Sequence, residues 1–259
     1  MKKKTERKKI ILDTTIQIDK FVKKEIQEFL KKLRPSADFF SLFFVLYEFK
    51  SSFITALIRF YSLVNICETP AEAIEKFSNF PYTPRQLKYK SKMDALIANL
   101  NKSTNNGNES TEDYLAQIEA AILYFINNFD TDLKGKVGSF AGNDVVKFEI
   151  KSRDDFSKFD ELTKTQKIIE LKSFWDKNLN NLENLIYDSN VKKEKHVKKL
   201  YEALIKIKAD TNEANKFRTN KSVGDAVIAV DIPKSYLIAS TDKSFGVLCP
   251  ALKKEHIKP

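Results

Sequence analysis

Two stretches at opposite ends of the chain decide the fold: Ile10-Ile11-Leu12-Asp13-Thr14-Thr15 and Tyr236-Leu237-Ile238-Ala239-Ser240-Thr241-Asp242. Each begins with a short apolar run typical of a buried strand and ends on hydroxyl and carboxylate residues. The spacing of apolar residues between them is mainly helical. We therefore predict an α/β fold in which a helical insertion interrupts the sheet. Ligands of open parallel sheets gather at the carboxyl ends of the strands, where Asp13 and Asp242 fall.

Apolar residues spaced three and four apart predict helices through most of the chain. The expected helices cover residues 18–33, 38–64, 87–100, 115–129, 162–187, 191–208 and 226–230. Two segments allow a strand as well, namely the start of 38–64 and the stretch 145–150. Ser110 with Asp113 predicts a helix N-cap, and the polar residues 101–110 predict a loop. The sheet-forming core is assigned to residues 1–85 and 215–259, and the mainly helical insertion to residues 86–214.

The composition excludes several classes of protein. The chain has 259 residues, of which 42% are hydrophobic and 12% aromatic, so it can bury a core and is not globally disordered. No stretch reaches the ~18 uncharged apolar residues of a membrane helix. The basic start of the chain is not followed by a hydrophobic region long enough for export. Cys67 and Cys249 are too few for a disulfide framework or a zinc site and are expected to be buried thiols. We expect a cytoplasmic protein with no membrane partner.

The net charge of +10 favours a polyanionic partner, because Lys and Arg that neutralise phosphates release condensed counterions. In the expected helix 191–208, an apolar stripe lies opposite four lysines, Lys192, Lys195, Lys199 and Lys206. These lysines are candidates for contacts with nucleic-acid phosphates. An ordinary solvated helix face is the alternative interpretation.

Four acids stand out by their positions. Asp13 and Asp242 each follow a strand, Glu48 interrupts an apolar helix and Asp225 opens another. Carboxylates are seldom buried unless they are paired or bind a metal, and four that converged would need a cation such as Mg²⁺ or Mn²⁺. Each acid also has a structural interpretation: an N-cap for the three Asp residues and a solvent-facing position for Glu48.

The sequence resembles the PIN-domain nucleases in four blocks: Ile11-Leu12-Asp13-Thr14, Tyr47-Glu48-Phe49, Gly224 to Ala229 and Ser240 to Phe245. The resemblance implies an α/β/α sandwich with a central parallel sheet and a site where carboxylates hold Mg²⁺ or Mn²⁺. It implies hydrolysis of phosphodiester bonds in RNA or, as in some branches of the family, in DNA, and RNA is favoured for this chain. Carried over by position, Asp13, Glu48, Asp225 and Asp242 are the catalytic, metal-binding carboxylates. Ser240 stands where the family usually has a threonine and is expected to bond to a carboxylate or to metal-bound water.

Two alternatives remain. One is a non-catalytic PIN-like module that binds nucleic acid or protein. The other rests on Leu12 to Thr15, Gly224-Asp225 and Asp231, which resemble haloacid-dehalogenase phosphatases, although Thr15 replaces their second Asp. The sequence leaves open whether residues 86–214 bind a protein partner or inhibitor, and whether the chain dimerises. It also leaves open a role as a toxin with an antitoxin, a defence effector or a processing enzyme.

Overall fold

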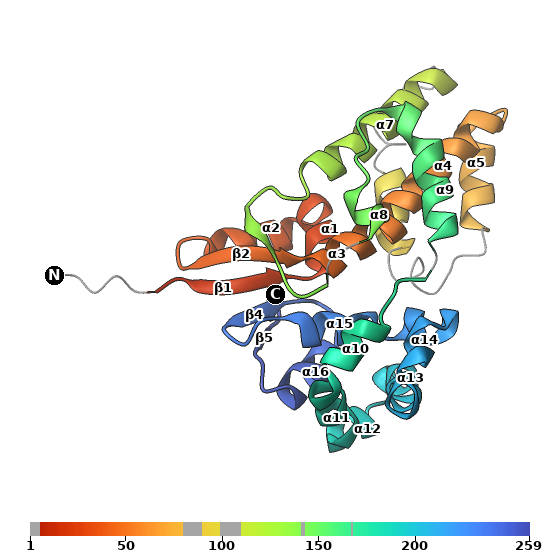
Figure 1. The fold of residues 1–259 in the computed structure, drawn as a ribbon. Coiled ribbons are helices and arrows are strands. Elements are labelled where there is room, and N and C mark those ends of the chain that lie inside the picture. The colour runs from red at the N-terminus through yellow and green to blue at the C-terminus, as the bar shows by residue number, and fades with distance from the viewer. Residues whose placement is uncertain (1–5, 80–89, 99–109, 141–142, 167) are drawn as a thin grey trace. The chain divides into compact units, whose positions relative to one another are not determined.

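The computed structural model describes residues 6–79, 90–98, 110–140, 143–166 and 168–259 (Figure 1). The chain forms two compact units. Unit 1 contains residues 1–46, 132–143 and 167–259, and unit 2 contains residues 47–131 and 144–166. These boundaries differ from the predicted ones at residues 85 and 215. Helical spacing alone does not distinguish helices that pack in the sheet-containing unit from helices that pack on one another.

Unit 1 is built on a five-stranded parallel sheet with the strand order β3-β2-β1-β4-β5. The strands are β1 (Lys8–Leu12), β2 (Ala37–Leu42), β3 (Leu133–Val137), β4 (Tyr236–Ala239) and β5 (His256–Ile257). The predicted α/β class with a parallel sheet is therefore confirmed. The apolar runs that begin at Ile10 and Tyr236 lie in β1 and β4, which are neighbours at the centre of the sheet.

Both faces of the central strands are buried. Ile10 and Leu12 of β1 face a cluster that includes Ile16, Ile26 and Leu30 of the helices that follow. Ile11 points to the opposite face, because successive side chains of a strand alternate, and it is fully buried as well. Burial on both faces explains why these strands read as continuous apolar runs.

The helix predicted over 18–33 is two helices, α1 (Thr14–Val22) and α2 (Lys24–Leu33). Lys23 between them has an extended backbone, with φ −121° and ψ 118°. The stretch predicted as a helix over 38–64 starts with strand β2, as the sequence allowed. It continues as α3 (Phe43–Glu48), a π-helical segment (Phe49–Ile54) and α4 (Thr55–Ile66).

The remaining helices of unit 1 differ from the predicted ones: those within 162–187 and 191–208 are shorter, the helix predicted over 226–230 covers 224–231, and those over 217–222 and 245–251 were not predicted. They are α10 (Lys172–Lys177), α11 (Leu179–Tyr187), α12 (Ser189–Lys193), α13 (Lys198–Ala209), α14 (Phe217–Ser222), α15 (Gly224–Asp231) and α16 (Phe245–Ala251). Trp175 and Asn220 are fully buried among them. The Asn220 amide donates to the carbonyl oxygens of Ile169 and Ala214, at 2.7 and 2.9 Å.

Unit 2 is helical. Its elements are α4, α5 (Pro70–Ser78), α7 (Thr111–Asn127), α8 (Asp144–Lys147) and α9 (Phe156–Thr165). Helix α4 packs against α5, α7 and α9 (Figure 1). Aromatic side chains fill these contacts: the ring of Phe60 lies 4.9 Å from that of Phe77 and 6.3 Å from that of Tyr114.

Several smaller predictions are also settled. Ser110 and Asp113 form the expected capping box of α7, and residues 145–147 are helical rather than extended. Residues 90–98 of the helix predicted over 87–100 are helical, while 101–109 lie outside the described residues. Both cysteines are buried, unpaired thiols. Across the described ranges, no helix has the length and apolarity needed to span a membrane.

A half-buried lysine closes the carboxyl end of α15. The Lys254 amine donates to the carbonyl oxygens of Ala229, Val230 and Ile232, each at 2.7 Å. These carbonyls include helix-terminal groups that have no partner within the helix. The position of a positive charge at a helix carboxyl end is also electrostatically favourable.

Replacement of Lys254 by Met should destabilise the protein by about 1–3 kcal/mol, because three carbonyl oxygens lose their donor. Urea unfolding of wild type and variant at pH 7 measures the difference. Lys253→Met provides the control, since the neighbouring Lys253 is exposed. Equal stability of the two variants would contradict the assigned role of Lys254.

The stability of the wild type should also rise with pH relative to Lys254→Met. Burial lowers the pKa of the Lys254 amine from 10.5 to about 8. Above pH 8 the folded chain therefore loses a proton that the unfolded chain keeps, which favours the folded state by about 1 kcal/mol or less between pH 7 and 9. Unfolding curves of both proteins at pH 7 and pH 9 check this. A constant stability difference between the two pH values would refute it.

Candidate active site at the carboxyl ends of the central strands

Asp13 follows β1 directly and caps helix α1. Its carboxylate accepts a hydrogen bond from the backbone N–H of Ile16 at 2.9 Å and one from the Thr15 hydroxyl at 2.6 Å, both at Oδ1. The side chain is 1% exposed. The structural interpretation of Asp13 as an N-cap is therefore correct, but it accounts for only one of the two carboxylate oxygens.

The second oxygen of Asp13 meets the end of β4. Leu12 pairs with Ala239 across the two parallel strands, so the next residues, Asp13 and Ser240, leave the sheet side by side. The Ser240 hydroxyl donates to Oδ2 of Asp13 at 2.5 Å and accepts from the backbone N–H of Asp242 at 2.9 Å. The predicted bond from Ser240 to a carboxylate is confirmed.

Ser244 connects the remaining two Asp residues of the predicted set. Its hydroxyl lies 2.8 Å from Oδ2 of Asp225 and 3.0 Å from Oδ1 of Asp242. Asp242 Oδ1 also accepts the backbone N–H of Ser244 at 3.0 Å. A hydroxyl carries one proton, so the two carboxylates share a single donor at this point. Their oxygens lie no farther apart than the sum of the two distances from Ser244 Oγ.

Asp13, Ser240, Asp242, Ser244 and Asp225 thus form one hydrogen-bonded series, which we call the acid cluster. Asp225 lies in the first turn of α15, where the helix N-terminus favours a negative charge. It is not the N-cap, which is Val223. Asp242 precedes α16 and is also not its N-cap. For these two acids the N-cap interpretation is wrong.

Glu48 belongs to unit 2 and not to the part of unit 1 that carries the acid cluster. It ends α3 immediately before the π-helical segment, and it is 4% exposed, so it does not face solvent as the structural interpretation required. π-Helical segments are rare and frequently occur at functional sites. Two positions after Glu48, also in unit 2, the Lys50 amine donates hydrogen bonds to the carbonyl oxygens of Val146 and Phe148.

The acid cluster has the donor chemistry of a hard cation, since carboxylate and hydroxyl oxygens suit Mg²⁺ and Mn²⁺. Within the described ranges, however, no three His, Cys, Asp or Glu side chains are grouped closely enough to hold a metal ion. In this structure the hydroxyls of Ser240 and Ser244 connect the carboxylates to one another. A metal would therefore have to draw Asp13, Asp225 and Asp242 closer than these hydrogen bonds do.

Two residues that hydrogen-bond to the aspartates of the acid cluster were not among the predicted site residues. Thr15 and Ser244 each stand two positions after an Asp, at which distance a hydroxyl readily bonds to the aspartate side chain. That spacing, Asp-x-Thr and Asp-x-Ser, was a usable signal. His256 of β5 also lies here, with Nε2 3.0 Å from the carbonyl oxygen of Ser240.

The residues behind the phosphatase alternative have other roles in unit 1. Thr15, in the position of the missing second Asp, donates to Asp13. Asp231 binds a loop: its carboxylate accepts from the backbone N–H and the hydroxyl of Ser139, both at 2.6 Å. Gly138 of this loop has φ +106°, and a Cβ there would lie 2.2 Å from Asp231 Oδ2, so only glycine fits.

The four predicted phosphate-binding lysines do not share one helix. The stretch 191–208 is interrupted at Glu194, whose φ of −72° and ψ of 118° are extended. Lys192 lies on α12, Lys195 in a 3₁₀ turn, and Lys199 and Lys206 on α13. All four are exposed. The single lysine stripe predicted from helical spacing is therefore wrong, although Leu200, Leu204 and Ile207 form the expected buried stripe.

The chain was compared with models of protein families, with curated proteins and with solved structures, and no match was found in any of the three. The interpretation of the acid cluster therefore depends on its own geometry and chemistry.

Loss of the Ser240 hydroxyl should destabilise the folded protein by about 1–3 kcal/mol. In Ser240→Ala, Asp13 Oδ2 loses one buried hydrogen bond, and the backbone N–H of Asp242 loses a part-buried one. Ser235→Ala is the matched control because Ser235 is exposed, and it should change stability by less than about 0.5 kcal/mol. Urea unfolding at pH 7 compares the two, and equal midpoints would show that the cluster does not depend on Ser240.

Proposed function

We propose that the protein is a metal-dependent endonuclease of the PIN-like type that hydrolyses phosphodiester bonds, in RNA in preference to DNA. The observation that supports this most strongly is the acid cluster. Three carboxylates from three separate parts of the chain are gathered through Ser240 and Ser244 at the carboxyl ends of β1 and β4. That edge of a parallel sheet is where ligands bind.

The electrostatics of the cluster support a cationic cofactor. The negative carboxylates of the acid cluster repel one another because they lie close enough for single serine hydroxyls to connect them. Burial strengthens this repulsion because the local dielectric is low. Asp13 is nearly fully buried, and Asp225 and Asp242 share the proton of one hydroxyl. Asp13, Asp225 and Asp242 would hold Mg²⁺ or Mn²⁺. When bound, such an ion neutralises phosphate charge and lowers the pKa of a coordinated water.

The residues around the carboxylates fix their orientation. Thr15 and the Ile16 N–H hold one oxygen of Asp13, and Ser240 holds the other, so the carboxylate has no free rotation. Ser244 fixes Asp225 relative to Asp242. Once an ion had drawn the three carboxylates together, these hydrogen bonds would limit further rearrangement when a phosphodiester arrives, and positioning of this kind is a main contribution that a protein makes to phosphoryl chemistry. In the reaction, water forms the new bond to phosphorus and the 3′ oxygen leaves and takes up a proton.

Asp13→Asn should reduce cleavage by about 10²–10³-fold while the protein stays folded. Asparagine caps helices as well as aspartate does, so α1 keeps its N-cap while the negative charge is removed. The assay uses end-labelled single-stranded RNA and DNA with Mn²⁺, with Mg²⁺ and with excess chelator. RNA should be cut in preference to DNA, and the chelator should abolish cutting.

Asp38→Asn is the matched control. Asp38 lies in β2 of the same sheet and forms an ion pair with Arg7 at 2.9 Å, away from the acid cluster. This variant should cut like wild type. Undiminished cutting by Asp13→Asn, or cutting that survives the chelator, would refute the proposal. RNA binding without cleavage and without a thermal shift by Mn²⁺ would indicate a non-catalytic module, and phosphate transferred from a small phosphoester to Asp13 would indicate a phosphatase.

A further inference from the structure

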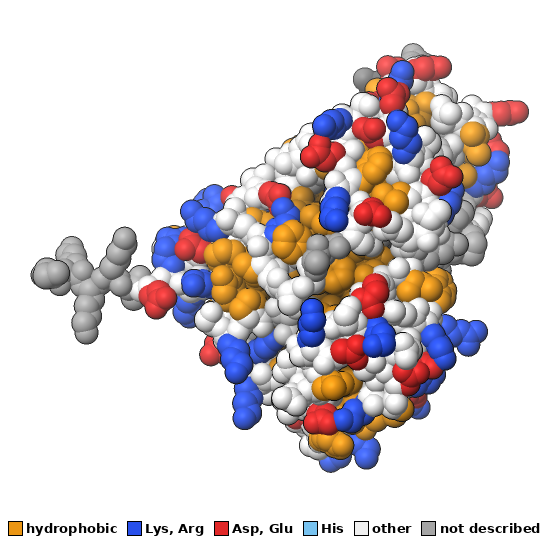
Figure 2. Space-filling model, viewed as in Figure 1, with side chains coloured by type: hydrophobic (Ala, Val, Ile, Leu, Met, Phe, Trp, Pro, Cys, Tyr) orange, Lys and Arg blue, Asp and Glu red, His pale blue; other side chains and the backbone are white. Residues whose placement is uncertain are grey.

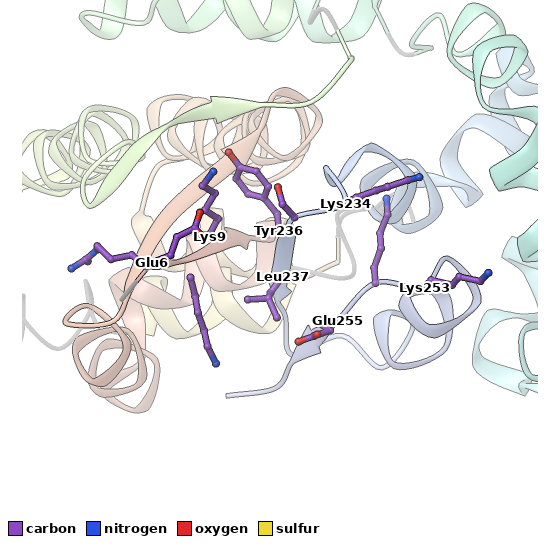
Figure 3. Close-up of a pocket in the computed structure, with 11 residues that line it drawn as sticks. Glu6, Lys9, Lys234, Tyr236, Leu237, Lys253 and Glu255 are labelled. Carbon is purple, nitrogen blue, oxygen red and sulfur yellow. The ribbon is translucent and has the colours of Figure 1, made fainter. Parts of the chain in front are cut away.

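A basic hollow lies at the end of the sheet opposite the acid cluster. It has a volume of about 480 Å³ and lies where β1 and β4 begin and just before β5 (Figure 3). Six basic and two acidic residues line it, together with Ser235, Tyr236 and Leu237. Its basic residues are Arg7, Lys8, Lys9, Lys234, Lys253 and Lys254. Figure 2 shows Lys and Arg side chains on the surface around β4 and β5.

Two of these cations serve the fold. Lys254 closes α15, as described above, and Arg7 donates to the carbonyl oxygens of Arg34, Pro35 and Ala37 as well as to Asp38. Lys9 is half-buried, and its amine lies 5.5 Å from the centre of the Tyr236 ring. The lysines Lys8, Lys234 and Lys253 are exposed.

These three exposed lysines form no ion pair with a carboxylate among the described residues, although Glu6 and Glu255 also line the hollow. A second hollow at the same end of the sheet, lined by residues of β2 and β3, provides a contrast. There the arginines are paired, Arg7 with Asp38 and Arg34 with Asp132 at 2.9 and 2.7 Å. The excess positive charge is therefore a property of the first hollow and not of the whole sheet edge.

We propose that the basic hollow binds the phosphodiester backbone of single-stranded nucleic acid, at a site separate from the acid cluster. The lysines supply point charges suited to phosphates, and Tyr236 and Leu237 supply a floor of half-buried apolar surface. The Tyr236 ring is not available for base stacking. It makes a T-shaped contact with the Phe40 ring, with 5.1 Å between the ring centres, and the Lys9 amine lies over it. The site therefore recognises the backbone without reading sequence.

Distance makes the hollow an accessory site for a longer target. Lys8 lies five positions before Asp13 of the acid cluster, which corresponds to about 16 Å at 3.3 Å per residue along β1. A ligand short enough to occupy only the acid cluster does not reach the hollow. This inference rests on the proposed function in taking nucleic acid as the ligand, but it does not depend on cleavage.

The test measures the binding of a labelled, unstructured 30-nucleotide RNA by fluorescence anisotropy. Excess chelator is present so that no cleavage occurs. The variant Lys8→Glu/Lys234→Glu/Lys253→Glu should bind at least about tenfold more weakly at 0.1 M salt. The slope of log affinity against log salt should fall by about two, as three phosphate contacts are lost. The control Lys24→Glu/Lys31→Glu/Lys32→Glu changes the net charge equally on exposed positions of α2 and should retain its affinity within about threefold.

The remaining outcomes are decisive as well. Equal loss in both triple variants, or loss only in Lys192→Glu/Lys195→Glu/Lys199→Glu, would overturn the proposal, as would weakened binding to anionic lipid vesicles with unchanged RNA binding. Absence of RNA binding by the wild type would overturn it too. If Glu substitutions lower the thermal midpoint, the neutral variant Lys8→Gln/Lys234→Gln/Lys253→Gln replaces them, with the same expected direction. Selective loss of RNA binding in a protein that never cuts RNA would support the hollow and refute the nuclease.

Discussion

The hydrogen bond from Ser240 to Asp13 joins the carboxyl ends of the two central strands, and the arrangement of the site depends on it. Asp13 has to cap α1 and face the end of β4 at once, which its two oxygens allow. Ser240 in turn accepts the backbone N–H of Asp242 and so fixes the turn that leads to Ser244. One buried hydroxyl thus links a strand, a helix N-terminus and the turn that holds the third carboxylate.

Charge is unevenly distributed between the two ends of the sheet. Carboxylates gather where β1 and β4 end, and basic residues gather where the same strands begin. Buried carboxylates are tolerated only when hydrogen bonds or a cation compensate them. In the acid cluster the compensation comes from the hydroxyls of Thr15, Ser240 and Ser244 and from backbone N–H groups.

The sequence predicted the centre of the sheet well and its edges poorly. β1 and β4 are apolar runs that end on Asp13 and Ser240, and those signals depend on burial alone. β3 was missed because Leu133-Lys134-Gly135-Lys136-Val137 alternates with lysines around a glycine, and β5 is only two residues long. The helix breaks at Lys23 and Glu194 contain neither proline nor glycine, so tertiary packing and not local sequence determines them. The role of Glu48 was expected from a resemblance in a short motif and stays a prediction; spacing along the chain carried no information on which unit would hold this residue.

The bond between Ser240 and Asp13 spans 227 positions of the chain. A chain is made from its first residue onward at about 5–20 residues per second, so β4, the second neighbour of β1 in the sheet, is synthesised roughly 10–45 s after β1. Until then β1 can pair only with β2, and Asp13 has no Ser240 to hold it. On the proposed function, a ribosome therefore carries a nascent chain that cannot cut RNA, and the capacity to do so arises only when β4 has been released and has inserted beside β1.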